Sequence, residues 1–188
     1  MKTLEYLERS TDPFEVVISR AGSGHRLNMA GVYQDTVTRE WVIQSYLGAT
    51  QIEGEERIQK KWYDVNALSD PGVLMEAVSS ALEADVIVVS VYAAEELPLN
   101  LYVWVAAWLP RRLSRTGAMA ALVGVAEPQD SQTARTIEYL EAVARRAQLE
   151  FVPQARRRTG ASPVPTKPLT EPDRQLYFHH DRHWGLNE

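Results

Sequence analysis

Two hydrophobic patterns alternate along most of this chain. Short apolar runs rich in valine and isoleucine are separated by longer segments in which apolar residues recur every three or four positions. The first pattern is typical of buried strands and the second of amphipathic helices. Their alternation predicts an α/β domain with a parallel sheet and helices on both of its faces.

The predicted strands differ in polarity, and this difference predicts their order. Strands are predicted at residues 14–19, 57–63, 85–91, 118–125 and 149–152. The third and fourth are continuous apolar runs, as expected of strands buried on both faces. The second carries Lys60 and Lys61, which suit a sheet edge, and the fifth is short and stopped by Pro153. We therefore expect the flavodoxin-like order 2-1-3-4-5, because the order 3-2-1-4-5 would bury the lysines.

Helices are predicted between these strands. They cover residues 30–47, 71–82, 97–113 and 131–147. In the first, Tyr33, Val37 and Trp41 recur every four residues, and Gly48 is a reasonable stop. The second starts at Asp70-Pro71, an N-cap followed by proline. In the last, Glu141 and Arg145 have the spacing of an ion pair.

A fifth helix, usual after the last strand of such folds, is missing from the pattern. Residues 153–188 contain Pro153, Pro163, Pro165, Pro168 and Pro172, so no long helix fits. We expect a single domain over residues 1–152 and an extended proline-rich tail over 153–188, docked on the domain or on a partner subunit. Part of the sheet face shared by the first and fifth helices needs another cover. The candidates are the tail, residues 1–12 and a partner.

Composition and charge narrow the classes of partner. Hydrophobic residues make up 45% and charged residues 24% of the 188 residues, which is the balance of a globular protein. The net charge of −5 makes nucleic acid an unfavoured partner. Basic clusters around Arg111 and Arg112, and around Arg156 and Arg157, are therefore interpreted as solvated helix ends.

The residue types that are missing exclude further classes. The chain has no cysteine, which excludes disulfides, thiolate nucleophiles and cysteine-based metal sites. Its longest apolar runs, residues 86–91 and 118–126, are far shorter than the ~20 residues that a helix needs to cross a bilayer. No signal-peptide pattern is present. We expect a cytoplasmic protein that has no membrane partner.

Doubly wound folds bind ligands at the carboxyl ends of their strands, beside the point where the strand order reverses. The candidate cofactor-binding residues there are Ser19, Ser23, Gly24 and Tyr92. The loop at residues 20–26 could turn backbone N–H groups toward a phosphate such as that of FMN. It lacks threonine, carries arginines and matches neither the dinucleotide fingerprint nor the P-loop, so a plain flexible loop is the alternative.

No catalytic residue is predicted. Glu95 and Glu96 follow the third strand, and Glu127 follows the fourth, where carboxylates could act as acid and base or hold a metal. For the first two, a place in the first turn of the third helix or just before it, where the helix dipole favours negative charge, is the simpler interpretation.

Three histidines near the end of the sequence resemble a metal cluster. His179, His180 and His183 lie together, and the last two have a spacing compatible with one face of a helix. They follow a proline-rich stretch and have no distant ligand to complete a site. Adventitious metal binding is therefore expected rather than a resident metal.

The third predicted helix is apolar around most of its circumference. A helix that covers one sheet face needs only a single apolar stripe. Either large neighbours bury both stripes, or one of them contacts another subunit. Tryptophan and tyrosine are favoured interface residues. The predicted interface residues are Tyr102, Trp104, Trp108 and, in the tail, Trp184.

Several segments carry a resemblance to known sequences. They are residues 84–90, 95–98 and 104–108 and the ending 183–188, His-Trp-Gly-Leu-Asn-Glu. Together they resemble a family of uncharacterised bacterial proteins. The resemblance implies a flavodoxin-like fold with a recurring, docked tail, and it implies no activity and no catalytic residue.

Function is thus predicted only as a class. The favoured hypothesis is a non-catalytic domain that acts through protein association, as a homo-oligomer or with a regulatory partner. The alternative is a flavin- or nucleotide-binding enzyme that uses the cleft at the strand carboxyl ends.

Overall fold

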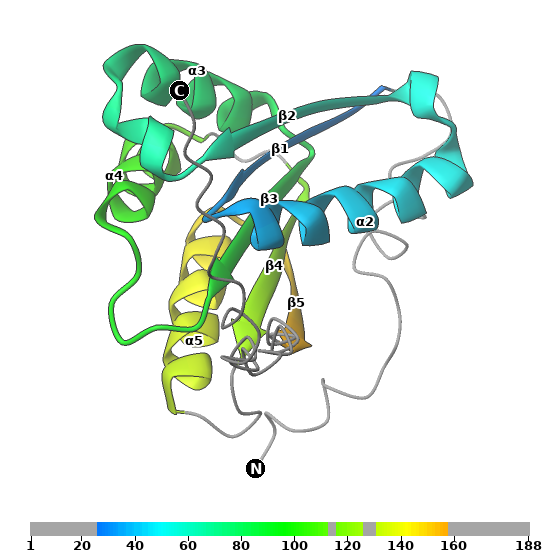
Figure 1. The fold of residues 1–188 in the computed structure, drawn as a ribbon. Coiled ribbons are helices and arrows are strands. Elements are labelled where there is room, and N and C mark those ends of the chain that lie inside the picture. The colour runs from blue at the N-terminus through cyan, green and yellow to red at the C-terminus, as the bar shows by residue number, and fades with distance from the viewer. Residues whose placement is uncertain (1–25, 113–115, 126–130, 158–188) are drawn as a thin grey trace, which may run out of the picture. The chain divides into compact units, whose positions relative to one another are not determined.

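The computed structural model describes residues 26–112, 116–125 and 131–157. Within them, five parallel strands form one sheet in the order β2-β1-β3-β4-β5 (Figure 1). The predicted order is confirmed, and the topology is flavodoxin-like. The strands are β1 (Leu27–Tyr33), β2 (Ile58–Asp64), β3 (Val86–Tyr92), β4 (Ala118–Val125) and β5 (Glu150–Arg157). The helices are α2 (Thr36–Glu53), α3 (Pro71–Glu83), α4 (Leu99–Trp108) and α5 (Ser131–Arg146).

Strand β1 lies later in the chain than the first predicted strand. It pairs with β2 on one side and β3 on the other, so the prediction of a helix from residue 30 is wrong over residues 30–33. Gly31 fits this central position because a Cβ there would lie 2.5 Å from the backbone oxygen of Val88. The strand predicted at residues 14–19 lies outside the described residues.

Helix α2 starts and ends later than predicted, and the stripe that it buries shares Trp41 with the predicted one. It continues past Gly48 and ends before Gly54, whose φ of 88° lies in the left-handed region. Val37, which was predicted to lie on the apolar stripe, is 39% exposed, and Leu47 further along the helix is 51% exposed. The predicted stripe was out of phase because it started from Tyr33, which is a strand residue. The buried residues of α2 are Thr38, Trp41, Val42, Ser45, Tyr46 and Ala49.

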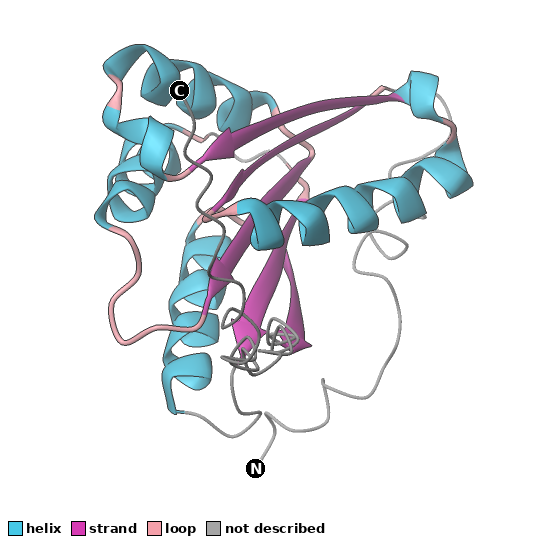
Figure 2. Cartoon of the chain, in the orientation of Figure 1, coloured by secondary structure: helices cyan, strands magenta, loops and turns pink. Residues whose placement is uncertain are grey.

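The two faces of the sheet carry separate apolar cores. Figure 2 shows the helices that lie on either side of the strands. Helices α3, α4 and α5 cover one face, where Ile87, Leu101 and Trp104 are fully buried. On the other face, α2 packs Trp41 and Val42 against side chains of β1, β3 and β4. Among the described helices, α2 alone covers this second face. The predicted cover by the tail lies outside the described residues.

The edge strands are those predicted. On β2, Lys60 and Lys61 lie near carboxylate oxygens of Glu55 and Glu76, at 3.8 and 3.6 Å. Strand β5 is longer than predicted, because it continues through Pro153, paired in register with Ala121, and ends at Arg157. An edge strand tolerates proline where the missing N–H would face away from the sheet.

Two of the arginines that were expected at solvated helix ends, Arg112 and Arg156, instead bond to other elements of the fold. Arg112 is only 8% exposed, and its guanidinium donates to the backbone oxygens of Ala81 and Ala84 at 2.5 and 2.8 Å. It thereby satisfies carbonyls at the C-terminal end of α3. Arg156 belongs to β5 and donates to the Ser45 hydroxyl of α2 at 3.2 Å. For these two residues, the interpretation as solvated helix ends is wrong.

The remaining helices follow their predicted starts more closely. Asp70 caps α3, with Pro71 at its first position, and α5 carries the predicted Glu141–Arg145 pair at 3.2 Å. Helix α4 is shorter than the predicted 97–113, because Pro110 ends the α-helical ladder and leaves a 3₁₀ turn at Leu109–Arg111.

Candidate functional site

The first candidate site lies at the carboxyl ends of β1 and β3, where the strand order reverses. Only Gln34 and Asp35 separate β1 from α2. The Gln34 N–H donates to the backbone oxygen of Ser90 at 3.2 Å. The Gln34 side-chain oxygen accepts from the Tyr92 N–H at 3.1 Å. This residue therefore bridges both strands at the position where ligands of this fold class bind.

Asp35 closes the N-terminus of α2 with a capping box. Its carboxylate accepts from the Thr38 N–H at 2.9 Å, and the Thr38 hydroxyl accepts from the N–H of Asp35 at 2.8 Å. The same hydroxyl accepts from the Gln34 N–H at 2.9 Å. Three N–H groups at this end of the helix, those of Gln34, Asp35 and Thr38, are thus engaged by the chain itself.

The Asp35 carboxyl is held in its ionised form. Burial raises its pKa, but hydrogen bonds from the Thr38 backbone, the Tyr92 and Thr38 side chains and the Val37 backbone lower it by more. The resulting pKa lies below the ordinary value. A negative charge therefore stands at the positive end of the α2 dipole.

Aromatic side chains fill the space around this cap. The Trp41 and Tyr92 rings meet edge-to-face with centroids 5.8 Å apart. A Cβ on Gly124 of β4 would lie 2.6 Å from both rings. Beneath them, the Ser90 hydroxyl donates to the Thr38 oxygen at 2.8 Å, and both residues are buried. Side chains rather than open space occupy this part of the site.

The described residues at this end of the sheet do not fit a flavin phosphate. A phosphate at the N-terminus of α2 would lie beside the Asp35 carboxylate, and two anions there would repel each other. Of the predicted cofactor-binding residues, Tyr92 lies at this site. Ser19, Ser23 and Gly24 lie outside the described residues, and the segment that follows β1 is Gln34–Asp35 rather than residues 20–28.

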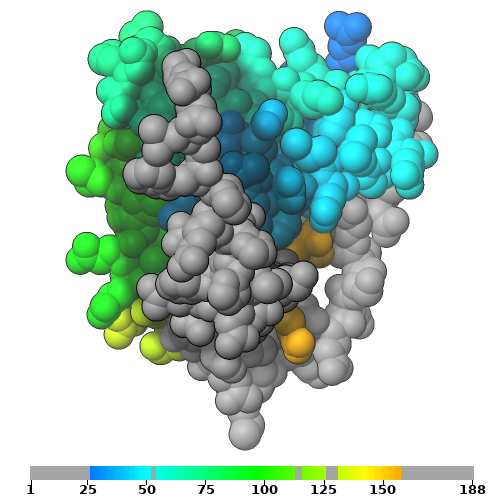
Figure 3. Space-filling model, viewed as in Figure 1, coloured from blue at the N-terminus to red at the C-terminus, as the bar shows by residue number. Residues whose placement is uncertain are grey.

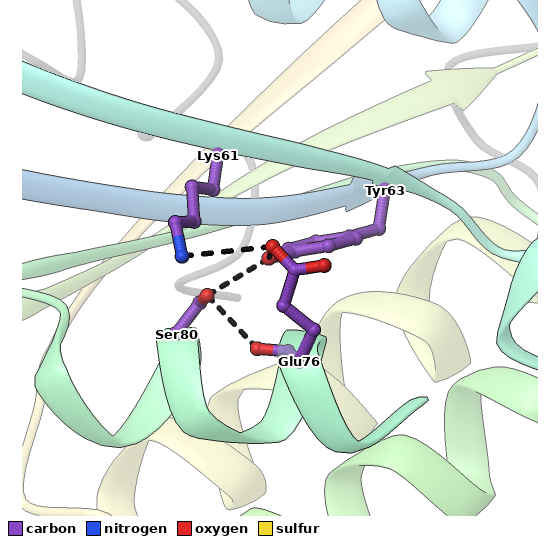
Figure 4. Close-up of polar contacts among 4 residues, drawn as sticks. All are labelled: Lys61, Tyr63, Glu76 and Ser80. Carbon is purple, nitrogen blue, oxygen red and sulfur yellow. Dashed lines mark hydrogen bonds and ion pairs between the residues drawn. The ribbon is translucent and has the colours of Figure 1, made fainter. Parts of the chain in front are cut away.

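A second polar cluster joins the edge strand β2 to α3 (Figure 4). The Tyr63 hydroxyl lies 2.8 Å from the Ser80 hydroxyl and donates to Glu76 at 3.2 Å. Burial raises the pKa of Tyr63; the Ser80 hydrogen bond lowers it, and the Glu76 carboxylate raises it further. The phenol is therefore a weaker acid than usual, and the cluster ties β2 to α3 instead of supplying a base. Sequence reasoning missed it because Tyr63, Glu76 and Ser80 share no motif.

The third feature is the outer face of α4, which is apolar and exposed. Leu99 and Val103 are 74% and 44% exposed, and Ala106 and Pro110 are exposed one and two turns further on. Their spacing of four, three and four residues places them on one side of the helix. No charged residue occurs within α4. In Figure 3 the green residues of this region lie at the left rim of the molecule.

The other sides of α4 are buried, which corrects part of the predicted interface. Trp104 and Trp108 are 0% exposed and pack together with ring centroids 5.7 Å apart. They support the helix from beneath and do not reach a partner. Tyr102 is half-buried against Tyr139 of α5 at 5.0 Å, and burial raises the pKa of Tyr139 to about 12. Trp184 lies outside the described residues.

The described residues provide neither a metal site nor a membrane-spanning helix. Among the described residues, no group of three or more His, Cys, Asp or Glu side chains could hold a metal ion. His179, His180 and His183 are not among them. Glu95 pairs with Arg135 at 3.7 Å, and both Glu95 and Glu96 lie just before α4, within the predicted range of positions. No described helix is long and apolar enough to cross a membrane.

Comparison with known proteins does not assign the chain to a family. Neither a protein-family model nor a curated protein matches the sequence. The fold is flavodoxin-like in topology. The resemblance to a bacterial family beyond that fold stays a prediction.

Proposed function

We propose that this domain works by binding another protein and contacts it through the outer face of α4. The exposed stripe from Leu99 to Pro110 is the observation that carries the proposal. Single exposed apolar residues are common on proteins, but an uncharged helix with a continuous exposed stripe is a feature of contact surfaces.

The support beneath α4 suits a contact surface. Trp104, Trp108 and Leu101 are fully buried, so the helix is fixed on the sheet before any partner arrives. A rigid surface loses little conformational entropy on binding. At the N-terminal end of this face the flanking residues are polar, because Glu95 pairs there with Arg135 of α5. An apolar centre with a polar rim is the usual anatomy of an interface.

The site at the carboxyl ends of β1 and β3 supports a non-catalytic role. Gln34 and Asp35 engage the backbone donors there, and Trp41 and Tyr92 fill the space beside them. We therefore rank protein association above flavin or nucleotide chemistry at this position.

The size of the protein in extracts of its own cells tests the proposal. Wild type is expected to elute well above its 21.2 kDa monomer mass in size-exclusion chromatography. Val103→Asp is expected to shift it toward monomer, because a carboxylate in an apolar contact is costly to desolvate. The matched control is Leu47→Asp, on an equally exposed apolar position of α2. Elution of the wild type as a monomer, or an equal shift by both variants, would overturn the proposal.

A further inference from the structure

We infer that the partner is a second copy of this chain, packed with its α4 antiparallel to the first across a two-fold axis near Val103. The inference rests on the proposed function and names the occupant of the same surface. Charge at the two ends of the stripe is the observation that selects this occupant.

The two ends of α4 carry opposite charges. Glu95 and Glu96 precede the helix and are exposed, whereas Arg111 follows it and is exposed. Glu95 already pairs with Arg135, so Glu96 is the exposed carboxylate that we assign to the contact at this end. The helix between them is uncharged. The exposed stripe of α4 is thus preceded by acidic residues and followed by a basic one.

Antiparallel packing of two such faces is self-complementary. A two-fold axis brings residues that are equally distant from it, on opposite sides, next to each other. With the axis at Val103, Glu96 precedes the axis by about as many residues as Arg111 follows it, so the acidic end of one copy is expected to approach the basic end of the other. Parallel packing would instead place like charges together at both ends, which is unfavourable.

The apolar middle fits the same axis. Leu99 of one copy then lies opposite Ala106 and Ala107 of the other, so that a large side chain packs against small ones. Val103 meets its own symmetry mate at the centre. A stable dimer buries about 800 Å² on each partner. One short helix face is smaller than that, so exposed flanking residues such as Met75 of α3 are expected to contribute.

A single cysteine tests the axis directly, because the chain has none of its own. In the purified full-length protein, Val103→Cys is expected to form a disulfide-linked dimer on mild oxidation with copper phenanthroline. A disulfide forms only where Cβ atoms approach to about 4.5 Å, so the cross-link reports the axis itself. Leu47→Cys, equally exposed but on the opposite face of the sheet, is the control and is expected to stay unlinked.

Charge reversal tests the pairing. Glu96→Arg and Arg111→Glu are each expected to weaken dimerisation by roughly tenfold in sedimentation equilibrium, since each reverses both symmetry-related pairs. The double variant is expected to restore it, which a merely destabilised monomer would not do. Thermal unfolding of each variant shows whether the fold is intact.

The outcomes separate this inference from the function it rests on. A purified dimer that cross-links at position 103, with rescue by the double variant, supports it. A purified monomer beside a larger complex in extracts overturns the second copy and leaves protein association standing. A dimer that links at position 47 instead of 103, or charge variants without rescue, overturns the antiparallel α4 contact.

Discussion

Asp35 sets what the N-terminus of α2 can bind. A helix N-terminus with unengaged N–H groups attracts anions, and phosphate sites in doubly wound folds use this property. Here the Asp35 carboxylate accepts from the Thr38 N–H and brings its own negative charge. The same side chain that stabilises the helix therefore works against an anionic ligand.

Replacement of Asp35 tests this role. Asp35→Ala is expected to lower the free energy of unfolding by about 1 kcal/mol at neutral pH, because it removes an N-cap. The folded-state pKa of Asp35 is lowered, so its ionisation stabilises the fold above the unfolded pKa of about 3.9. That contribution is lost as the pH falls through the lower folded pKa. Urea unfolding at neutral and acidic pH measures both effects.

The control is Glu40→Gln, an exposed acidic residue further along α2. It is expected to leave both the stability at neutral pH and the acid dependence nearly unchanged. If the Asp35→Ala variant lost as much stability on acidification as the wild type does, Asp35 would not be the group whose titration lowers the stability in acid.

At the scale of elements, the boundary between β1 and α2 was the hardest feature to predict from the sequence. The valine-rich β3 and the apolar β4 were found because continuous apolar runs have few other interpretations. Strand β1, with only Val32 as a β-branched residue, was taken as part of a helix. The spacing of Asp35 and Thr38 is the capping signal that would have placed the start of α2 correctly.

The contacts of Arg112 join two helices, and no local sequence pattern predicts them. It follows α4 in sequence, yet its guanidinium satisfies carbonyl oxygens at the end of α3, 28 and 31 residues away. Only the packing of α3 beside α4 brings these groups together. Sequence reasoning therefore interpreted the arginine as solvated, because a cation after a helix is usually exposed.

Truncation of Arg112 is expected to be costly. Arg112→Ala would leave buried carbonyls of Ala81 and Ala84 without this donor, with an expected loss of about 2–4 kcal/mol in the free energy of unfolding. Arg112→Lys would recover only part of it, because an ammonium does not reproduce the fork of the guanidinium. Arg146→Ala, at an exposed arginine in the last turn of α5, is the control and is expected to change stability by less than about 0.5 kcal/mol. Equal losses for both alanine variants in urea unfolding would contradict this role.

At the scale of the molecule, the charge on β2 was enough to order the sheet. Lys60 and Lys61 cannot lie between two neighbouring strands and two helix layers without burying charge, so β2 had to be an edge. The site could not be obtained in the same way. The bridge made by Gln34 and the aromatic packing of Trp41 on Tyr92 join segments more than 50 residues apart, and no spacing in the sequence encodes them.

The face of the sheet that carries α2 leads to the last prediction. Three helices cover the opposite face, but α2 is the one described helix here, and it lies over β1, β3 and β4. Val152, Gln154 and Arg156 of β5 point to the same face, in register with Ala120, Leu122 and Gly124. The prediction that residues beyond the last strand cover this region follows from the missing fifth helix and is still open to test.

Deletion of residues 158–188, which leaves β5 whole, is expected to lower the free energy of unfolding and to raise the fluorescence of the apolar dye ANS. Uncovering apolar surface costs about 25 cal/mol for each Å², and the dye binds where it is exposed. Deletion of residues 1–25 is the matched comparison, because residues 1–12 were the other candidate cover within the chain. If only that second deletion had these effects, the N-terminal segment would be the cover. If neither did, neither chain segment would be the cover, which would leave a partner subunit or α2 alone.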